Sequence, residues 1–488
     1  MRPSAPNTPS AGRTYPPHTR AAALVMIATV PLVLLAWLFK TPGWSLAAGI
    51  ALLAYLALTW ADLRRSTRRA VGAMLIIGWS ALLITGADPV SLAARLSDNA
   101  VVGVLIVACG MLAVPAASPR YVAELSRLVS GASGRRPPLS RLALVFWTGH
   151  LLGALLNISA LSVLLPALGG ARARDNRLMR SLHRGFALAG FWSPFYATVA
   201  IVLIAYPGAG WRGLLVATLP VLPIAFLLDM AAALRHGRTA LARAVVPPTD
   251  EARAADAAEA KARDAATAGQ RGPSLWLAAG GLACLGIGLD LVMPGPTLVW
   301  VIVAALIAAH VWMLWSQGPR ATWTRLVRPR LIGPPGMTLQ ANEIAVFAAA
   351  GPLAAGLAAI LAPAAPDIAA AANAVPLWLA ILAVQMAIFG LSHLGVHPVA
   401  SILLVAGALP DQVVAGREAL FAGASLAGYT LTLLASPFSV TGQVFASLTG
   451  ASPWNQTVTR NIGYALIMGL AVAFWLDLGA LSLLAVLD

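Results

Sequence analysis

Long apolar runs separated by short polar segments make up most of the chain. A helix needs about 20 apolar residues to cross a bilayer. Runs of about that length lie at 21–39, 43–60, 70–87, 101–118, 185–206, 214–234, 274–292, 297–316, 342–362, 419–448 and 461–486. The pattern predicts an all-α integral membrane protein with eleven spanning helices, preceded by a polar, proline-rich cytoplasmic tail over residues 1–20.

Two further apolar runs, 142–170 and 376–409, are longer than one span requires. Basic residues flank the run 142–170 on both sides, and a single span would place one of these clusters outside the cell. We therefore expect a re-entrant hairpin, or two very short spans, that returns to the side it entered. The run 376–409 is expected to form a second hairpin, open to the opposite side.

The composition excludes a soluble protein. The chain is 59% hydrophobic and 10% charged, whereas soluble domains carry about 25% charged residues. The net charge of +15 comes mainly from arginines in the loops, so membrane orientation explains it and no nucleic-acid partner is expected. Cys109 and Cys284 each lie inside an apolar run, so neither a disulfide framework nor a cysteine metal site is indicated.

The basic residues also orient the chain in the membrane. With a cytoplasmic N-terminus, 29 of the 33 lysines and arginines fall on the cytoplasmic side, and the exceptions are Lys40, Arg95, Arg212 and Arg417. This bias follows the positive-inside rule. It predicts a multi-pass protein of a bacterial inner membrane with a periplasmic C-terminus.

The order of the runs predicts two inverted repeats, 43–234 and 274–488, each with three spans, a hairpin and two further spans. The helix at 21–39 precedes the first repeat. The charged, alanine-rich segment 235–273 is expected to be a cytoplasmic linker between the repeats. Oppositely oriented repeats are typical of secondary transporters.

Local sequence matches support the repeat. The segment SPFYAT, residues 193–198, recurs in the second half as SPFSVT, residues 436–441. A histidine stands in each hairpin, at His150 and at His393. Proline interrupts a helix, and irregular backbone in a membrane is tolerated only where protein buries it or where it lines a cavity. We expect the two hairpin tips and the two broken helices to meet in one binding site.

The candidate ligands for a solute or an ion are polar residues at these tips and breaks. They are Asn157, Ser159, Ser162, Ser193, Thr198, His393, His397, Ser436, Thr441 and Gln443. Hydroxyl and amide side chains also form hydrogen bonds between membrane helices, so a structural role is an alternative for each. The histidines could contact an anion or take up a proton, or they could be neutral and satisfied by neighbouring groups.

Two coupling ions, Na⁺ and H⁺, fit the sequence. Neutral oxygens would bind Na⁺ near Asn157 and Ser436, whereas a histidine would carry H⁺. The carboxylates Asp229, Asp290 and Glu343 lie near the ends of predicted spans, where an interfacial position is expected. No metal site and no cofactor are predicted, because no acidic or cysteine residue lies beside the histidines at ligand spacing.

The hairpins carry the segments LNISALSVLLPAL, residues 156–168, and GVHPVASILL, residues 395–404. Together with the layout of the runs, these segments resemble the ion transporter superfamily of secondary carriers, in particular the divalent anion/sodium symporters and the citrate and arsenite carriers. That group has a Ser-Asn-Thr signature at each tip. Asn157 and Ser159 stand at the signature positions of the first tip, whereas the second tip has His-Pro at 397–398.

The resemblance implies an elevator-type transporter. A domain made of the hairpins and the broken helices would move against a scaffold that dimerises, so the protein is expected to be a homodimer. The implied function is secondary active transport of a small, anionic, dicarboxylate-like organic solute, coupled to Na⁺ or H⁺.

A channel or exporter on the same scaffold is one alternative, and a membrane-embedded enzyme, such as a glycan or lipid transferase, is another. Such enzymes usually need a large extramembrane loop with catalytic charges, whereas the longest loop here is low in complexity. No H-E-x-x-H, G-x-S-x-G or P-loop motif occurs. The chain is therefore not expected to be an enzyme.

Overall fold

The structure is a computed structural model. It describes residues 17–97, 99–116, 118–130, 138–161, 163–165, 167–168, 176–240, 273–320, 322 and 341–480. Every regular element in these residues is a helix. Most of the predicted N-terminal tail, positions 241–272 of the predicted linker and residues 481–488 lie outside the described part.

The helices follow the predicted order along the chain. Those of the first half are α1 (Pro17–Phe39), α2 (Pro42–Thr59), α3 (Arg65–Ile84), α4 (Pro89–Ser97), α5 (Ala100–Ala116), α6 (Pro119–Ser130), α7 (Pro138–Leu156), α9 (Asn176–Leu188), α10 (Ala197–Ala205), α11 (Gly210–Thr218) and α12 (Val221–Ala240). Those of the second half are α14 (Leu275–Val292), α15 (Thr297–Gln317), α18 (Ala341–Leu361), α19 (Ala365–Asn373), α20 (Leu377–His393), α21 (Pro398–Ala408), α22 (Asp411–Val414), α23 (Glu418–Ala435), α24 (Val440–Thr449) and α25 (Arg460–Trp475). Short 3₁₀ or π turns join several of them: η1 (Trp60–Asp62), η2 (Asn157–Ala160), η3 (Ala189–Phe191), η4 (Pro207–Ala209), η5 (Ala362–Ala364), η6 (Asn455–Thr459) and η7 (Leu476–Ala480).

Eleven helical segments of the described chain are long and apolar enough to cross a membrane, so the protein is a multi-pass membrane protein. Ten of them coincide with predicted spans. The remaining segment, Leu139–Leu156, belongs to the first predicted hairpin. The predicted span 185–206 is absent from the set, because this part of the chain is divided between the short helices α9 and α10.

Both predicted hairpins contain a helix followed by a tight turn, and in the second hairpin α21 follows the turn. In the first, α7 ends at Leu156 and Asn157 adopts a φ of 53°. In the second, α20 ends at His393 and Gly395 adopts a φ of 90°. These values lie in the left-handed region, which asparagine and glycine enter more readily than other residues. Re-entry at one face of the membrane stays a prediction for both segments.

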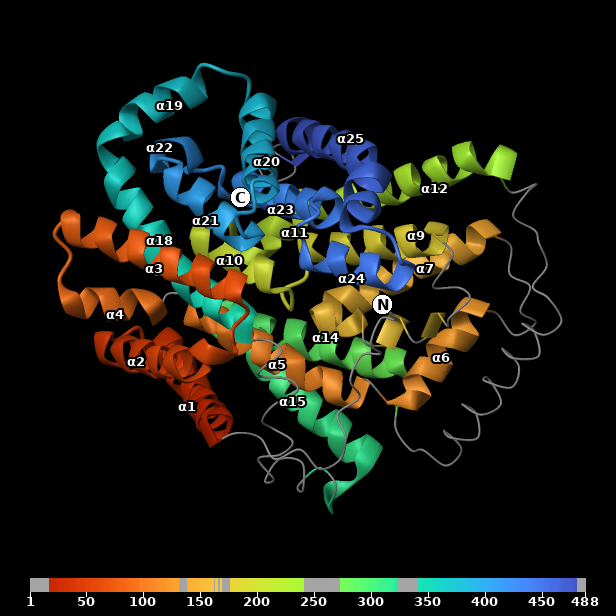
Figure 1. The fold of residues 1–488 in the computed structure, drawn as a ribbon, viewed down its shortest axis with the longest axis horizontal. Coiled ribbons are helices and arrows are strands. Elements are labelled where there is room, and N and C mark those ends of the chain that lie inside the picture. The colour runs from red at the N-terminus through yellow and green to blue at the C-terminus, as the bar shows by residue number, and fades with distance from the viewer. Residues whose placement is uncertain are drawn as a thin grey trace.

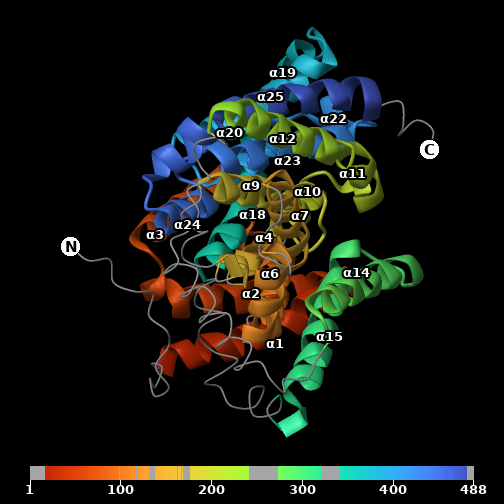
Figure 2. The ribbon, with the colours of Figure 1, turned by 90° about the vertical axis from the view of Figure 1, so that its right-hand side faces the viewer.

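The helices form two groups with a third between them. In both views, α1, α2, α14 and α15 lie at one end of the molecule and α20, α23 and α25 lie at the other (Figure 1, Figure 2). The helices α7, α9 and α10 lie between these groups. The most buried helix lies in the second of these groups, since 89% of α23 is buried, whereas only 22% of α14 is buried.

A close helix crossing joins α3 to α18. A Cβ atom added to Gly78 would lie 2.5 Å from backbone atoms of Pro352 and Leu353. A Cβ atom added to Gly356 would lie 2.5 Å from the carbonyl oxygen of Gly78. The two backbones therefore touch through glycines, as is typical of helix pairs in membranes.

We expect Gly78→Ala to destabilise the protein, because the new methyl group meets backbone rather than a movable side chain. Overpacking typically costs about 1–3 kcal/mol. Gly280→Ala, on the exposed and open face of α14, is the matched control and should be neutral or slightly stabilising. Thermal unfolding in detergent measures both variants, and equal melting temperatures would contradict the close crossing.

Candidate functional site

Each predicted break interrupts a helix at a proline. The first break, at 193–196, lies between η3 and α10 and contains Pro194. The second, at 436–439, lies between α23 and α24 and contains Pro437. Proline has no backbone N–H, so the carbonyl four residues earlier loses its helical donor. In a membrane, other groups of the protein must satisfy that carbonyl.

At the second break, the carbonyl that loses its donor belongs to Leu433. Nε2 of His183 donates to this oxygen at 3.0 Å, the hydroxyl of Ser439 donates at 3.1 Å, and that of Thr441 donates more weakly at 3.5 Å. The ring of His183 also stacks on Phe445, with 4.6 Å between the ring centroids. Because His183 belongs to α9, a side chain of the first half completes the break of the second half.

The serines that open the two SPF segments make equivalent contacts. The hydroxyl of Ser193 donates to the carbonyl of Ala154 on α7 and accepts the backbone N–H of Phe195. The hydroxyl of Ser436 donates to the carbonyl of Ser392 on α20 and accepts the N–H of Phe438. A hydroxyl has one proton to donate. Each serine therefore uses that proton to hold its break against the first helix of the hairpin in the same half.

His150, on α7, is held in its neutral form. Nε2 of His150 lies 3.0 Å from the indole Nε1 of Trp192, which can only donate. Nε2 is therefore the acceptor, and Nδ1 carries the proton that is donated to the carbonyl of Gly185 at 3.2 Å. Both contacts tie the hairpin helix to the first broken helix.

His393, at the end of α20, has a different environment. Its Nδ1 lies 2.9 Å from the carbonyl oxygen of Phe389, and its Nε2 lies 3.1 Å from that of Ala435. Carbonyl oxygens only accept, and a neutral imidazole has one N–H, so it can satisfy one of the two at a time. Like His150, this residue joins a hairpin helix to the residue that precedes an SPF serine.

The hairpin tips hold the other predicted residues. Asn157 and Ser159 lie in η2 at the first tip, and Ser162 lies outside the described residues. At the second tip, Nδ1 of His397 accepts the backbone N–H of Val399 at 3.3 Å and so caps the start of α21. The side chain of His397 therefore has a local structural partner.

The two broken helices pack against each other with opposite directions. The side chain of Thr198 on α10 lies beside that of Tyr429 on α23. Directly after the end of α10, the hydroxyl of Tyr206 lies 3.2 Å from the hydroxyl of Ser425 on α23. Higher numbers on α10 thus pair with lower numbers on α23, which is the antiparallel arrangement expected of two inverted halves.

The predicted site residues that the structure describes lie at the two breaks, at the hairpin tips and on α24. Ser193 and Thr198 lie at the first break, and His393, Ser436 and Thr441 lie at the second. Asn157, Ser159 and His397 lie at the tips. Gln443 is exposed on α24, and its amide contacts the carbonyl of Phe438 at 3.4 Å. Contact with a solute or an ion stays a prediction for each of these residues.

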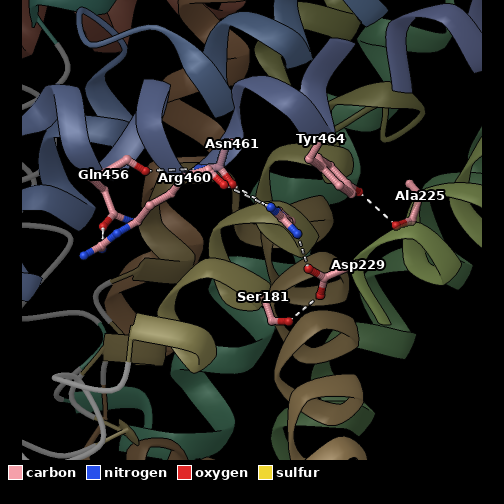
Figure 3. A network of polar contacts seen from close by, with 8 residues as sticks. Ser181, Ala225, Asp229, Gln456, Arg460, Asn461 and Tyr464 are labelled. Atoms are coloured by element: carbon pink, nitrogen blue, oxygen red, sulfur yellow. Dashed lines mark hydrogen bonds and ion pairs between the residues drawn. The ribbon is translucent and has the colours of Figure 1, made fainter. Parts of the chain in front are cut away.

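A buried ion pair was not foreseen. Nη1 of Arg184 on α9 lies 2.6 Å from Oδ1 of Asp229 on α12, and the two side chains are 3% and 4% exposed. The hydroxyl of Ser181 donates to Oδ2 of the same carboxylate (Figure 3). Asp229 was expected at the membrane interface, and the segment 171–184 was expected to be a loop. Instead, α9 begins at Asn176 and brings Ser181 and Arg184 into the interior, where they meet the buried Asp229 of α12.

The pair extends to α25. Nε of Arg184 donates to Oδ1 of Asn461 at 3.0 Å, and Nη2 donates to the backbone carbonyl of Arg460 at 3.2 Å. The guanidinium group also lies over the ring of Tyr464, 4.1 Å from its centroid. Residues 455–459, just before this contact, form a π-helical turn, which is often found at functional sites.

Two cavities approach the first break. The larger one, about 750 Å³, lies between α1, α2, α4, α10, α11 and the start of α15. Lys40 and Arg95 are among its lining residues, and Asp and Glu are not. The smaller one, about 40 Å³, is lined by Ser193 and Pro194 of the first break and by Asp290. The two share Trp211 and a threonine of α15, so they adjoin.

No group of three or more His, Cys, Asp or Glu side chains is arranged to hold a metal ion among the residues that were placed.

We expect Ser193→Ala and Ser436→Ala each to lower stability, because each removes the donor that holds a break to its hairpin helix. The loss of one such hydrogen bond typically costs about 1 kcal/mol. Ser447→Ala, which changes an exposed hydroxyl of α24, is the control and should stay within about 0.5 kcal/mol of the unmodified protein. Denaturation monitored in the same detergent would reveal the difference, and three equal stabilities would refute the structural contacts.

Neither a protein-family model nor a curated protein matches this chain. Among solved structures, a transporter named YdaH from Alcanivorax borkumensis is similar, with a TM-score of 0.45 and 17% sequence identity. The alignment covers 86% of this chain and 98% of the other.

Proposed function

We propose that the protein is a secondary active transporter of a small, anionic organic solute of dicarboxylate type, in a bacterial inner membrane. The observation that carries the proposal is the pair of proline-broken helices, packed antiparallel and each held by the hairpin helix of its own half. A helix bundle with only a structural role in the membrane has no need of two such breaks. Each break costs helical hydrogen bonds that side chains must replace.

The larger cavity favours an anionic solute. A concave surface lined by charges of one sign attracts ions of the opposite sign. The larger cavity carries Lys40 and Arg95, and no carboxylate lines it. Trp37, Leu203 and Ile204 add apolar wall, which would suit the carbon skeleton of an organic acid. The adjoining small cavity reaches Ser193 but is also lined by Asp290, so the anion would bind in the larger cavity.

The arrangement of helices agrees with an elevator mechanism. The group α1, α2, α14 and α15 would be the scaffold, and the hairpins with the broken helices would be the moving domain (Figure 2). The exposed apolar residues of α14, among them Leu277 and Ile287, would face lipid or a second copy in a homodimer. Coupling would be to Na⁺ or H⁺.

The transport proposal predicts uptake by proteoliposomes of the purified full chain. A panel of radiolabelled dicarboxylates, beginning with succinate, would be offered under a Na⁺ gradient and, separately, under a pH gradient. At least one solute should accumulate under one gradient and should only equilibrate when the gradient is collapsed. Asn157→Ala and His397→Ala should lower this uptake if the tips bind the solute. Absence of uptake for the whole panel under both gradients would reject the assignment.

The charge of the larger cavity can be tested without a substrate. A cysteine placed at Ser45, a lining residue, in a chain with Cys109→Ala and Cys284→Ala, should react faster with a sulfonate-bearing methanethiosulfonate than with a trimethylammonium-bearing one. Electrostatic attraction in a cleft raises association rates by about tenfold or more. Lys40→Gln combined with Arg95→Gln should bring the two rates together.

Ser447→Cys in the same background reports the intrinsic reactivity of the two reagents at an exposed position. Equal rates at Ser45→Cys in the otherwise unmodified cavity would contradict the anionic specificity.

A further inference from the structure

The ion pair of Arg184 and Asp229 is the most strongly polar group in the interior of the described bundle. Asp229 lies near the middle of α12 and is 3% exposed. A buried charge is costly unless it is paired and hydrogen-bonded. Ionisable groups inside a membrane protein usually have a role in moving ions or solutes.

The two partners are held very differently. Arg184 keeps three other contacts, to Oδ1 of Asn461, to the carbonyl of Arg460 and to the face of the Tyr464 ring (Figure 3). These contacts are to neutral groups, and all belong to α25. Asp229 is held by Arg184 and by the hydroxyl of Ser181, which are both on α9. If the carboxylate leaves, Arg184 therefore loses its counter-ion but keeps its hydrogen-bonding and ring partners on α25.

The hydroxyl of Ser181 suits either form of the carboxyl group. It donates to Oδ2 of the carboxylate in this structure. A hydroxyl can also accept a hydrogen bond. If Oδ2 carried a proton, Ser181 would rotate and accept the new O–H, so that no buried polar atom would be left without a partner.

The surrounding charges are mostly positive. On α9, Arg177 and Arg180 lie on the same side as Arg184, and Arg180 is within electrostatic range of both Asp229 and Arg460. His183 and His150, on α9 and α7, are turned to the carbonyls of Leu433 and Gly185. On α25, Tyr464 donates its hydroxyl to the carbonyl of Ala225. Arg141 lies near the start of α7. Asp229 is the carboxylate that these elements place in contact with the arginines.

We propose that Asp229 is a proton-binding site that couples solute movement to H⁺, an inference that rests on the proposed transport function. Uptake of a proton forms an O–H bond at Oδ2 and removes the negative charge that holds α12 to Arg184. Arg184 stays on α25 through Asn461 and Tyr464, and the neutral contact with Ser181 is then what joins Asp229 to α9, so α12 moves more easily relative to α9. Low pH then favours the separated state, and high pH favours the paired state seen here.

The first test needs no substrate. The full chain in lipid nanodiscs is titrated from alkaline to acidic pH, and the C=O stretch of protonated carboxylic acids is recorded by infrared difference spectroscopy. We expect a component that is present in the unmodified protein and absent in Asp229→Asn. Asp411→Asn, which changes an exposed aspartate at the start of α22, should keep that component.

The second test uses the transport assay. With one unit of inward pH gradient, each coupled proton drives about tenfold accumulation. We expect Asp229→Asn to lose this accumulation of succinate, or of whichever dicarboxylate of the panel is taken up, and to retain exchange of labelled for unlabelled solute. The Asp411→Asn control should accumulate the solute as the unmodified protein does.

A third set of variants shows whether a loss of coupling is caused by a loss of folded protein. Arg184→Gln leaves a buried carboxylate without its cation and is expected to reduce the yield of folded protein. The double variant Arg184→Gln/Asp229→Asn removes both charges and should restore the yield without restoring H⁺ coupling. A melting temperature for each variant, in the detergent used for purification, shows which of them remain folded.

The outcomes separate the two proposals. An infrared titration identical in the unmodified protein and in Asp229→Asn overturns the proton site, whatever the transport result. Accumulation that survives in Asp229→Asn but disappears in His393→Gln also overturns it and assigns the proton to His393. Failure of the whole solute panel rejects the transport function and leaves the infrared result to decide the proton site.

Discussion

The carbonyl oxygen of Leu433 is the group on which the centre of the molecule depends. Pro437 removes its helical donor, and no water is available in the apolar interior to replace it. Two hydroxyls from the same break supply part of the replacement, and His183 of α9 supplies the rest. One backbone atom thus requires the first half of the chain to pack on the second, and the antiparallel pairing of α10 with α23 continues the same contact.

The outline of the fold was predictable because apolar length and loop charge are local properties. Ten of the eleven segments that could span a membrane were placed correctly from runs of apolar residues, and the second break was expected at Pro437. The error lies around α9. The segment that contains Arg177 and Arg184 is as basic as a cytoplasmic loop, so the predicted helix started at residue 185, whereas α9 starts at Asn176. Only the pairing of Arg184 with Asp229, 45 residues later, shows why this segment lies in the interior.

The candidate site was predictable in part for the same reason. Proline marks a break wherever it stands in an apolar run, so Ser193 and Ser436 were located from sequence, and the tips followed from the lengths of the hairpins. The ion pair was missed because the importance of Asp229 depends on a distant partner. A weak signal was present: Ser181 and Arg184 are three residues apart and therefore share one face of a helix. The sequence does not show that a carboxylate of α12 meets that face.

The neighbouring residues His183 and Arg184 connect the two features that we consider functional. They are adjacent on α9 and point in different directions. His183 points to the second break, and Arg184 points to α12 and α25. A helix as short as α9 moves as a unit. If α12 separates from Arg184, any shift of α9 must also move the imidazole that satisfies the carbonyl of Leu433. The charge state of Asp229 and the geometry of the second break are therefore joined through one turn of helix, without the need for a longer relay.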